Sequence, residues 1–346
     1  MKLGLDIGGV STKISLFSED GRSLHRERWP WPVKEAWPQW GSAMADKLAS
    51  LQQRYPGPLT GAVVSVTAEL SDAFASREVG VAEIVDAVEA LVGPSVPVGF
   101  VAADGALLPP LAARRDPWRV AAANWYATAR YIGQFYSDAM VVDIGSTTTD
   151  IIPVRQHRPC PAGRTDFQRL QSGELLYLGI ERTPLGYLVH RVPWEETWLE
   201  VAGEVFCTVG DAWRVAGWVR PGELYHAPVD GRTWSRDDAG RRLVKAVLAS
   251  WDDAARPIAR VLADYVVEVQ VTKTQGAIER VRQRHQLPES VPVFAVGQGA
   301  LPFARYFRAH RRPGWRLWAP PSACWSSEAL AVFLPQLEGI QSWATS

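Results

Sequence analysis

Two segments of the chain share one pattern, an apolar run that ends in Asp-Ile-Gly and is followed by hydroxyl side chains. The first contains Asp6 and Gly8, and the second contains Asp143 and Gly145. Apolar residues resume after each turn, so each segment is expected to form two strands joined by a tight turn. Glycine lets the backbone approach a ligand, and the N–H groups and hydroxyls around it can bind an anion. One such turn alone is also compatible with an ordinary hairpin, but its repetition favours two phosphate-binding turns.

The repeated pattern assigns anion binding to both turns and to a later glycine turn. The diphosphate- or nucleotide-binding candidates are Gly8, Gly9, Ser11, Thr12, Gly145, Ser146, Thr147, Thr148, Gly297 and Gly299. The last two follow an apolar strand, and a plain strand-to-helix turn is an equally good interpretation there. Asp6 and Asp143 stand at the mouths of the hairpins, where carboxylates can hold Mg²⁺ directly or through water. Lys13, just after the first turn, adds a positive charge.

Composition predicts a globular protein of about two domains. The chain has 346 residues, of which 47% are hydrophobic and 21% are charged, and its formal net charge is zero. A neutral chain lacks the basic surface that nucleic-acid binding needs. We see no run of 18 apolar residues and no signal-like N-terminus, so no membrane contact is expected. Small-molecule substrates are the expected partners, and the sequence does not indicate an oligomeric state.

Cysteine and histidine usage predicts a reducing, cytoplasmic setting. Cys160, Cys207 and Cys324 are widely separated, and the histidines show no metal-ligand spacing. A disulfide framework and a structural zinc site are therefore not expected. Mg²⁺ is the expected cofactor, and no organic cofactor is expected.

Strand and helix periodicities alternate along the chain, which is typical of an α/β fold. The expected elements are strands at 62–67, 96–101 and 293–296 and helices at 42–54, 81–92, 121–130, 257–285 and 326–334. The segment 185–250 is rich in Trp, Gly and Pro, and we interpret it as an irregular insertion.

Four groups of residues narrow the interpretation to one family. They lie at 67–72, 123–129, 142–153 and 182–184. Together with the hairpins they resemble the hydantoinase A/oxoprolinase-like proteins of the actin, sugar kinase and Hsp70 superfamily. They are most similar to the branch of tetrahydromethanopterin-linked C1-transfer pathway proteins, whose archaeal members form an aryl ether in methanofuran biosynthesis. The resemblance covers residues 1–185 well and 255–335 loosely.

The resemblance implies two actin-like, ribonuclease H-like domains around a central phosphate-binding cleft. The first domain is expected at 1–137, and the second at 138–335, with hairpin 141–154, insertion 185–250 and glycine turn 297–299. The resemblance also implies a transferase that joins an aminomethylfuran-methyl diphosphate to the phenol oxygen of a (γ-glutamyl)tyramine or tyrosine-like acceptor. Diphosphate is the leaving group.

This chemistry suggests roles for individual residues. A furfuryl diphosphate ionises readily, so the main task is to stabilise the leaving diphosphate. Glu69 and Asp166 are candidates for the base that takes the phenol proton, and structural roles for both are equally open. Trp125 can face the furfuryl cation. The catalytic candidates are Asp6, Asp143, Lys13 and Glu69, the substrate-binding candidates are Asn124, Trp125, Asp166 and Arg182, and the metal-binding candidates are Asp6 and Asp143.

Two other function classes fit the same hairpins. An ATP-dependent enzyme of the sugar kinase or hydantoinase/oxoprolinase type would use them to hold ATP. A kinase needs a defined catalytic Asp for a substrate hydroxyl, and none stands out in the sequence. A non-catalytic nucleotide-binding or pathway-assembly protein is the third class.

Overall fold

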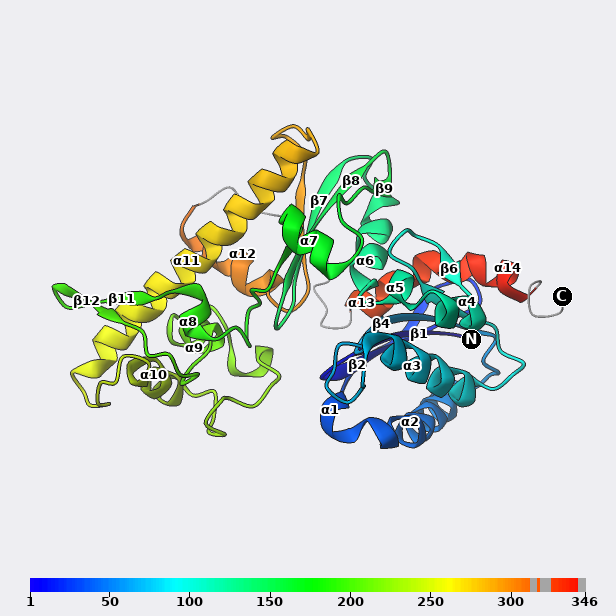
Figure 1. The fold of residues 1–346 in the computed structure, drawn as a ribbon, viewed down its shortest axis with the longest axis horizontal. Helices are drawn as coiled ribbons and strands as arrows, with labels where there is room; N and C mark the ends of the chain where they lie inside the picture. The colour runs from blue at the N-terminus through cyan, green and yellow to red at the C-terminus, as the bar shows by residue number, and fades with distance from the viewer. Residues whose placement is uncertain (312–315, 318–324, 342–346) are drawn as a thin grey trace. The chain divides into compact units, whose positions relative to one another are not determined.

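The computed structural model describes residues 1–311, 316–317 and 325–341 and divides into two compact units (Figure 1). The first unit comprises Met1–Ala139, Ile152–Gln171 and Ala323–Ser346. The second comprises Met140–Ile151 and Ser172–Ser322. Each unit combines a β-sheet with helices, so the predicted α/β class is confirmed.

The first unit is built on a six-stranded sheet in the order β3-β2-β1-β4-β5-β6. Its strands are β1 (Lys2–Gly8), β2 (Ser11–Phe17), β3 (Ser23–Pro30), β4 (Gly61–Thr67), β5 (Val98–Val101) and β6 (Leu107–Leu108). The antiparallel pairing of β1 with β2 confirms the first predicted hairpin. Since β1 also pairs parallel with β4, Asp6 lies between Lys13 on one neighbour and Ser65 on the other.

Different helices cover the two faces of this sheet. The helices of the first unit are α1 (Val33–Ala36), η1 (Trp37–Gln39), α2 (Trp40–Arg54), α3 (Arg77–Val92), α4 (Pro110–Arg115), α5 (Pro117–Val120), α6 (Asn124–Gly133), α7 (Asp166–Ser172), α13 (Trp325–Ala329), η3 (Leu330–Gln336) and α14 (Leu337–Gln341). Side chains alternate across a strand, so Leu3, Leu5 and Ile7 pack with residues of α2 and α3 on one face. Gly4 and Asp6 point to the opposite face, where they meet α13 and η3.

Two helices differ from their predicted bounds for reasons that the structure shows. The helix predicted at 121–130 begins at Asn124, because Ala121 forms a parallel bridge with Val66 and Ala122 has a φ of 50°. The helix predicted at 326–334 is α-helical only to Ala329 and continues as the 3₁₀ helix η3, which contains Pro335. Proline lacks the N–H that an α-helical bond needs. These last elements pack on the first sheet, whereas the sequence interpretation assigned residues up to 335 to the second domain.

A second sheet has the order β10-β8-β7-β13-β14. Its strands are β7 (Ala139–Ile144), β8 (Thr149–Arg155), β10 (Leu175–Leu176), β13 (Val293–Val296) and β14 (Arg316–Leu317), and β9 (Arg158–Pro159) pairs with the later part of β8. The part of β8 from Ile152 onwards and β9 belong to the first unit by chain contacts. The neighbouring strands β7 and β8 are joined by the turn 145–148, which confirms the second predicted hairpin. The strand β13 lies parallel to β7, so the glycine turn at 297–299 begins beside the end of β7.

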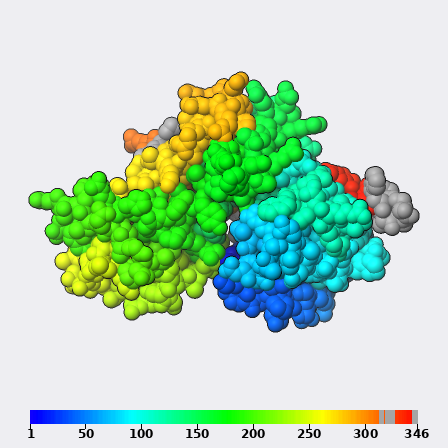
Figure 2. Space-filling model, in the orientation of Figure 1, coloured from blue at the N-terminus to red at the C-terminus, as the bar shows by residue number. Residues whose placement is uncertain are grey.

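The segment 185–250 is ordered into regular elements, so its interpretation as irregular is wrong. It contains α8 (Leu185–Leu188), β11 (Arg191–Trp194), β12 (Thr197–Glu200), α9 (Val209–Val215), η2 (Pro221–Glu223) and α10 (Arg236–Lys245). These elements pack on the 30-residue helix α11 (Ala255–Arg284) and form a continuous packed surface with it (Figure 2).

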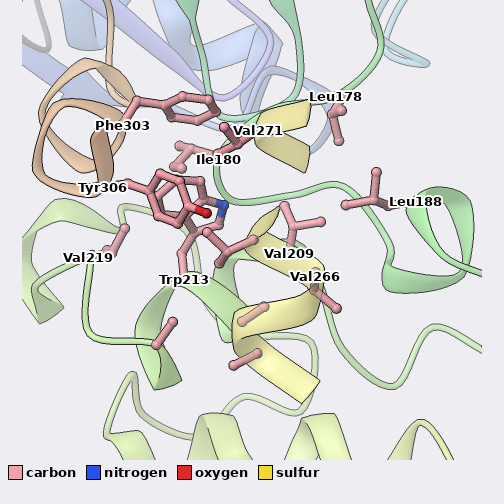
Figure 3. Close-up of a cluster of buried hydrophobic side chains, with 14 of the residues drawn as sticks. Leu178, Ile180, Leu188, Val209, Trp213, Val219, Val266, Val271, Phe303 and Tyr306 are labelled. Atoms are coloured by element: carbon pink, nitrogen blue, oxygen red, sulfur yellow. The ribbon is translucent and has the colours of Figure 1, made fainter. Parts of the chain in front are cut away.

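A buried tryptophan explains this order. Trp213 of α9 is fully buried and stacks on Phe303 of α12 (Ala300–Ala309), with ring centroids 4.8 Å apart. Its Nε1 donates to Gln270 Oε1 of α11 at 2.7 Å. Figure 3 shows Trp213, Phe303 and Tyr306 turned towards one another among aliphatic side chains. Apolar burial of this kind, with the polar N–H paired, stabilises helices that local sequence does not predict.

Within the described parts of the chain, no helix is both long enough and apolar enough to cross a bilayer. Cys207 is a free thiol, the Cys160 thiol donates to the Pro153 carbonyl at 3.6 Å, and Cys324 lies outside the described residues. Burial raises the pKa of the Cys207 thiol well above its usual value, so this residue is a core side chain and not a thiolate nucleophile.

Candidate functional site

The Asp6 carboxylate is the centre of a buried polar network in the first unit. Its side chain has no solvent exposure. Oδ1 accepts a hydrogen bond from Ser65 Oγ at 2.9 Å, and Oδ2 accepts from Lys13 Nζ at 2.6 Å and from the Ser326 hydroxyl. Burial alone would raise the pKa of Asp6, but the charge of Lys13 and these hydrogen bonds hold it below its usual value. Asp6 is therefore ionised and fully paired at neutral pH.

These contacts do not fit direct coordination of Mg²⁺ by Asp6. Mg²⁺ takes six oxygen ligands at about 2.1 Å, whereas both oxygens of Asp6 already accept bonds from the protein, one of them from a cation. No group of three or more His, Cys, Asp or Glu within the described ranges is placed to hold a metal ion. The metal-ligand role expected for Asp6 is therefore at odds with its surroundings, and a role for Mg²⁺ stays a prediction.

The other residues of the first turn differ in exposure. Thr12 is fully buried, and its Oγ1 accepts a hydrogen bond from Trp40 Nε1 at 3.0 Å, so its hydroxyl is occupied in holding α2. Ser11 is also buried. A side chain at Gly8 would meet the Ser11 carbonyl at 3.0 Å, whereas one at Gly9 would meet nothing within 4 Å. The open approach to the backbone of this turn is therefore at Gly9.

The second turn has more accessible hydroxyls. Gly145 N–H donates to the Thr148 carbonyl at 2.9 Å and closes the turn, and Ser146, Thr147 and Thr148 are all partly exposed. The Ser146 carbonyl accepts a hydrogen bond from the Arg182 N–H at 2.8 Å. The backbone of Arg182 thus lies beside the turn 145–148. Its side chain is exposed and makes no ion pair with any described residue. Hydroxyls with a nearby cation suit an anion.

The glycine turn at 297–299 is packed against the end of β7. Gly297 has a φ of 80°, and a Cβ there would lie 2.3 Å from Asp143 Oδ1. A Cβ at Gly299 would lie 2.3 Å from Ile144 Cγ2, and the Gly299 N–H donates to the Ile144 carbonyl at 2.9 Å. Both glycines are therefore required by close backbone approach, which is a structural role; nucleotide binding by this turn stays a prediction.

The sequence interpretation missed a buried carboxylate next to this turn. Glu181 is 1% exposed and accepts hydrogen bonds from the His226 backbone N–H at 2.6 Å and from Gln298 Nε2 at 2.7 Å. Its Oε2 also lies 2.9 Å from His226 Nδ1. Burial would raise the pKa of Glu181, but these partners hold it below its usual value. This network ties the 185–250 segment to the glycine turn, and only the fold brings its three members together.

Glu69 is a buried carboxyl of a different kind. Its side chain is 2% exposed, and its Oε2 has no hydrogen-bond partner. Burial raises the pKa of Glu69 to about 7, with Arg77 lowering it and Asp166 raising it. The guanidinium of Arg77 is paired with Asp166, with Nη2 2.9 Å from Oδ2. Arg77 is a second residue that the sequence interpretation missed.

The ring of Trp125 is buried and contacts the guanidinium of Arg169. Its side chain is 2% exposed, and the Arg169 guanidinium lies 4.0 Å from the ring centroid. The ring is therefore already in contact with a fixed positive charge. Asn124 is the first residue of α6 and is partly exposed. Contacts of either residue with a substrate stay predictions.

The predicted site residues fall into two groups, one in each unit. The first unit holds Asp6, Gly8, Gly9, Ser11, Thr12, Lys13, Glu69, Asn124, Trp125 and Asp166, and the second holds Asp143, Gly145, Ser146, Thr147, Thr148, Arg182, Gly297 and Gly299. The expected approach of Asp6 to Asp143 stays a prediction.

Comparison with known proteins points to one family. Residues 60–310 match the sequence profile described as Hydantoinase/oxoprolinase. Over 213 residues the chain is 33% identical to the (4-{4-[2-(gamma-L-glutamylamino)ethyl]phenoxymethyl}furan-2-yl)methanamine synthase of Methanocaldococcus jannaschii. The aligned segment covers 61% of this chain and 60% of that protein. A protein of the same name from Methanococcus vannielii is 42% identical over 74 residues, or 21% of this chain and 33% of that protein. The chain thus matches less than two thirds of the length of these relatives.

A solved structure supports the fold alone. The ethanolamine utilization protein EutJ from Carboxydothermus hydrogenoformans aligns with a TM-score of 0.51 and 13% sequence identity. The alignment covers 96% of this chain and 89% of that one.

Proposed function

Because the chain belongs to the hydantoinase/oxoprolinase family, we propose that it is a transferase of methanofuran-type C1-carrier biosynthesis that forms an aryl ether. This is the family that the sequence motifs predict. The observation that carries the proposal is the 33% identity over 213 residues with a synthase whose name describes a phenoxymethyl furan. The proposed donor is an aminomethylfuran-methyl diphosphate, and the proposed acceptor is the phenol of a (γ-glutamyl)tyramine or tyrosine-like compound.

The first hairpin supports the proposal through a fixed positive charge. Lys13 is partly exposed, and its ammonium is held at 2.6 Å by the buried carboxylate of Asp6. A cation with its position fixed before the reaction stabilises charge that develops on a leaving group without reorganisation. In the proposed reaction that charge develops on the diphosphate oxygen as its bond to the furfuryl carbon breaks.

The second hairpin offers a matching set of neutral donors. The hydroxyls of Ser146, Thr147 and Thr148 are partly exposed, and Arg182 begins beside them. We assign this turn, within its own unit, to binding the oxygens of a phosphate group.

An ATP-dependent kinase or hydrolase remains the alternative, since the family profile is described by hydantoinase and oxoprolinase members and hairpins of this kind suit ATP equally well. One experiment separates the two functions. The protein is mixed with the furfuryl diphosphate, a phenolic acceptor and Mg²⁺ without ATP, and mass spectrometry follows the ether while a coupled assay follows released diphosphate.

We expect ether and diphosphate in equal amounts without ATP. Lys13→Gln should lower the rate strongly, while the matched control Lys34→Gln should not, because Lys34 pairs with Asp72 on the surface. Tyramine, γ-glutamyl-tyramine and tyrosine tested in parallel identify the acceptor. Ether that forms only with ATP, together with ADP, would support the alternative.

A further inference from the structure

We propose that Glu69 takes the proton of the acceptor phenol, and that Arg77, held by Asp166, is a positioning residue that sets the charge of Glu69. The inference rests on the proposed function and deepens it. It also chooses between the two candidate bases that the sequence leaves open.

The sheet places Glu69 close to the first turn. In the parallel pair of β1 and β4, Gly8 is the register partner of Thr67, and Thr67 Oγ1 donates to the Ile7 carbonyl at 3.3 Å. Both strands end at this edge, so the chain that leaves β4 towards Glu69 starts beside the turn that contains Gly9. The carboxyl ends of parallel strands are where α/β proteins bind their ligands. A base at this position lies in the same unit and at the same sheet edge as Lys13.

The backbone of Glu69 is fixed by close packing. A Cβ at Gly80 of α3 would lie 3.0 Å from both the Cα and the carbonyl oxygen of Glu69. The helix therefore approaches this segment as closely as a glycine permits. A carboxyl on such a backbone has a defined position, which proton transfer in a transition state requires.

The free carboxyl oxygen points to a ligand. Asp6 is buried in the same unit with every oxygen paired, whereas Glu69 Oε2 is buried without a partner. A buried polar atom without a partner destabilises a fold by about 1–3 kcal/mol, and native proteins retain few of them. A phenol O–H donor supplies the missing partner.

The charges that face Glu69 come from two helices. Arg77 at the start of α3 favours the ionised form, and Asp166 at the start of α7 disfavours it. Burial is the largest effect and raises the pKa of Glu69 to about 7. A base with its pKa near the working pH is both available and strong enough to accept a proton. Asp166 is already paired with Arg77, so we assign it to that ion pair and not to the phenol.

The proposed step breaks two bonds and forms two. The phenol O–H bond breaks, and its proton moves to Glu69 Oε2. The phenol oxygen forms a bond to the furfuryl methylene carbon, and the bond from that carbon to the diphosphate oxygen breaks with its electron pair on diphosphate. Glu69 then releases its proton to water.

The test measures kcat/KM for ether formation against pH. For the wild-type protein we expect a rise through a midpoint near 7, since only ionised Glu69 accepts a proton. Glu69→Gln should lower kcat/KM by about 10²–10⁴-fold and remove the rise, and Glu69→Asp should restore part of both. Glu35→Gln is the matched control, because Glu35 is exposed on α1. Circular dichroism checks that each variant is folded.

Two further variants test the positioning role. Arg77→Gln removes the charge that favours ionisation, so the midpoint should move to higher pH. Asp166→Asn removes the charge that opposes ionisation, so the midpoint should move to lower pH. Opposite shifts of the midpoint would not arise if the pair only held the fold together, and equal profiles for both variants would overturn the role of Arg77.

The experiment also separates the two proposals. If the wild-type protein forms ether and Glu69→Gln keeps both the rate and the rise with pH, then the role of Glu69 is wrong and the proposed function stands. If the wild-type protein forms neither ether nor diphosphate, then the proposed function fails and the role of Glu69 fails with it.

Discussion

Replacing Glu69 with Gln is expected to stabilise the protein above neutral pH. The folded-state pKa of about 7 lies above the ordinary value of 4.5. The unfolded chain therefore releases this proton at lower pH than the folded protein, so Glu69 destabilises the fold increasingly as pH rises above 4.5. The effect levels off above pH 7. A gap of about 2.5 between the two pKa values corresponds to roughly 3 kcal/mol in the free energy of unfolding.

The assay is urea unfolding at pH 5, 6, 7 and 8, followed by tryptophan fluorescence. Trp40 and Trp125 are buried in the same unit as Glu69 and report its unfolding. At pH 5 the folded side chains of both proteins are uncharged and only the unfolded wild-type chain is partly ionised, so the effect of ionisation is small there. Between pH 5 and pH 8 the advantage of the Gln variant should grow by about 2–3 kcal/mol. Since the chain has two compact units, each transition is fitted separately.

An exposed glutamate provides the control for this prediction. Glu35→Gln should show a difference from wild type that does not change with pH, because Glu35 is exposed. If the stability of the Glu69→Gln variant relative to wild type falls as pH rises, then ionised Glu69 has a favourable partner in the folded state. That result would refute the reasoning that burial dominates its ionisation.

Three further predictions concern contacts elsewhere in the two units. Lys13→Gln leaves the Asp6 carboxylate buried without its cation and should lower the free energy of unfolding by about 3–5 kcal/mol, measured by urea unfolding at pH 7. Gly179→Ala places a Cβ 2.4 Å from the backbone of the second turn, so diphosphate affinity measured by calorimetry should fall at least about tenfold. Arg242→Met removes the cation from Asp211, whose pKa burial already raises to about 6; stability should fall at pH 8 and much less at pH 5, where Asp211 is protonated.

The two hairpins could be predicted because their signals are local. Period-2 alternation and a glycine turn lie within about a dozen residues and hardly depend on the rest of the fold. The start of α6 could not be predicted from local sequence. Ala122 takes a left-handed φ next to Ala121, which bridges to Val66 of β4. The order of the 185–250 segment could not either, because it depends on Trp213 reaching Gln270 in another helix.

The candidate site shows the same division. Residue types at the turns predicted which side chains are candidates for anion binding. The state of each carboxyl depends instead on its tertiary neighbours: Asp6 gains three donors, Glu181 gains Gln298, and Glu69 keeps a free oxygen. Arg77 acquires its proposed role only where α3 meets α7. Sequence thus indicated where chemistry is expected but not the protonation of the groups there.

The hydroxyl that completes the pairing of Asp6 belongs to Ser326, which follows it by 320 residues. At about 5–20 residues per second, a ribosome adds this serine roughly 16–60 s after the aspartate. During that interval the nascent first sheet lacks α13, which covers β1 and β2. All of Ser172–Ser322 is synthesised in the meantime. The first sheet therefore receives the helix that covers β1 and β2, and Asp6 its last donor, only after the second unit has been made.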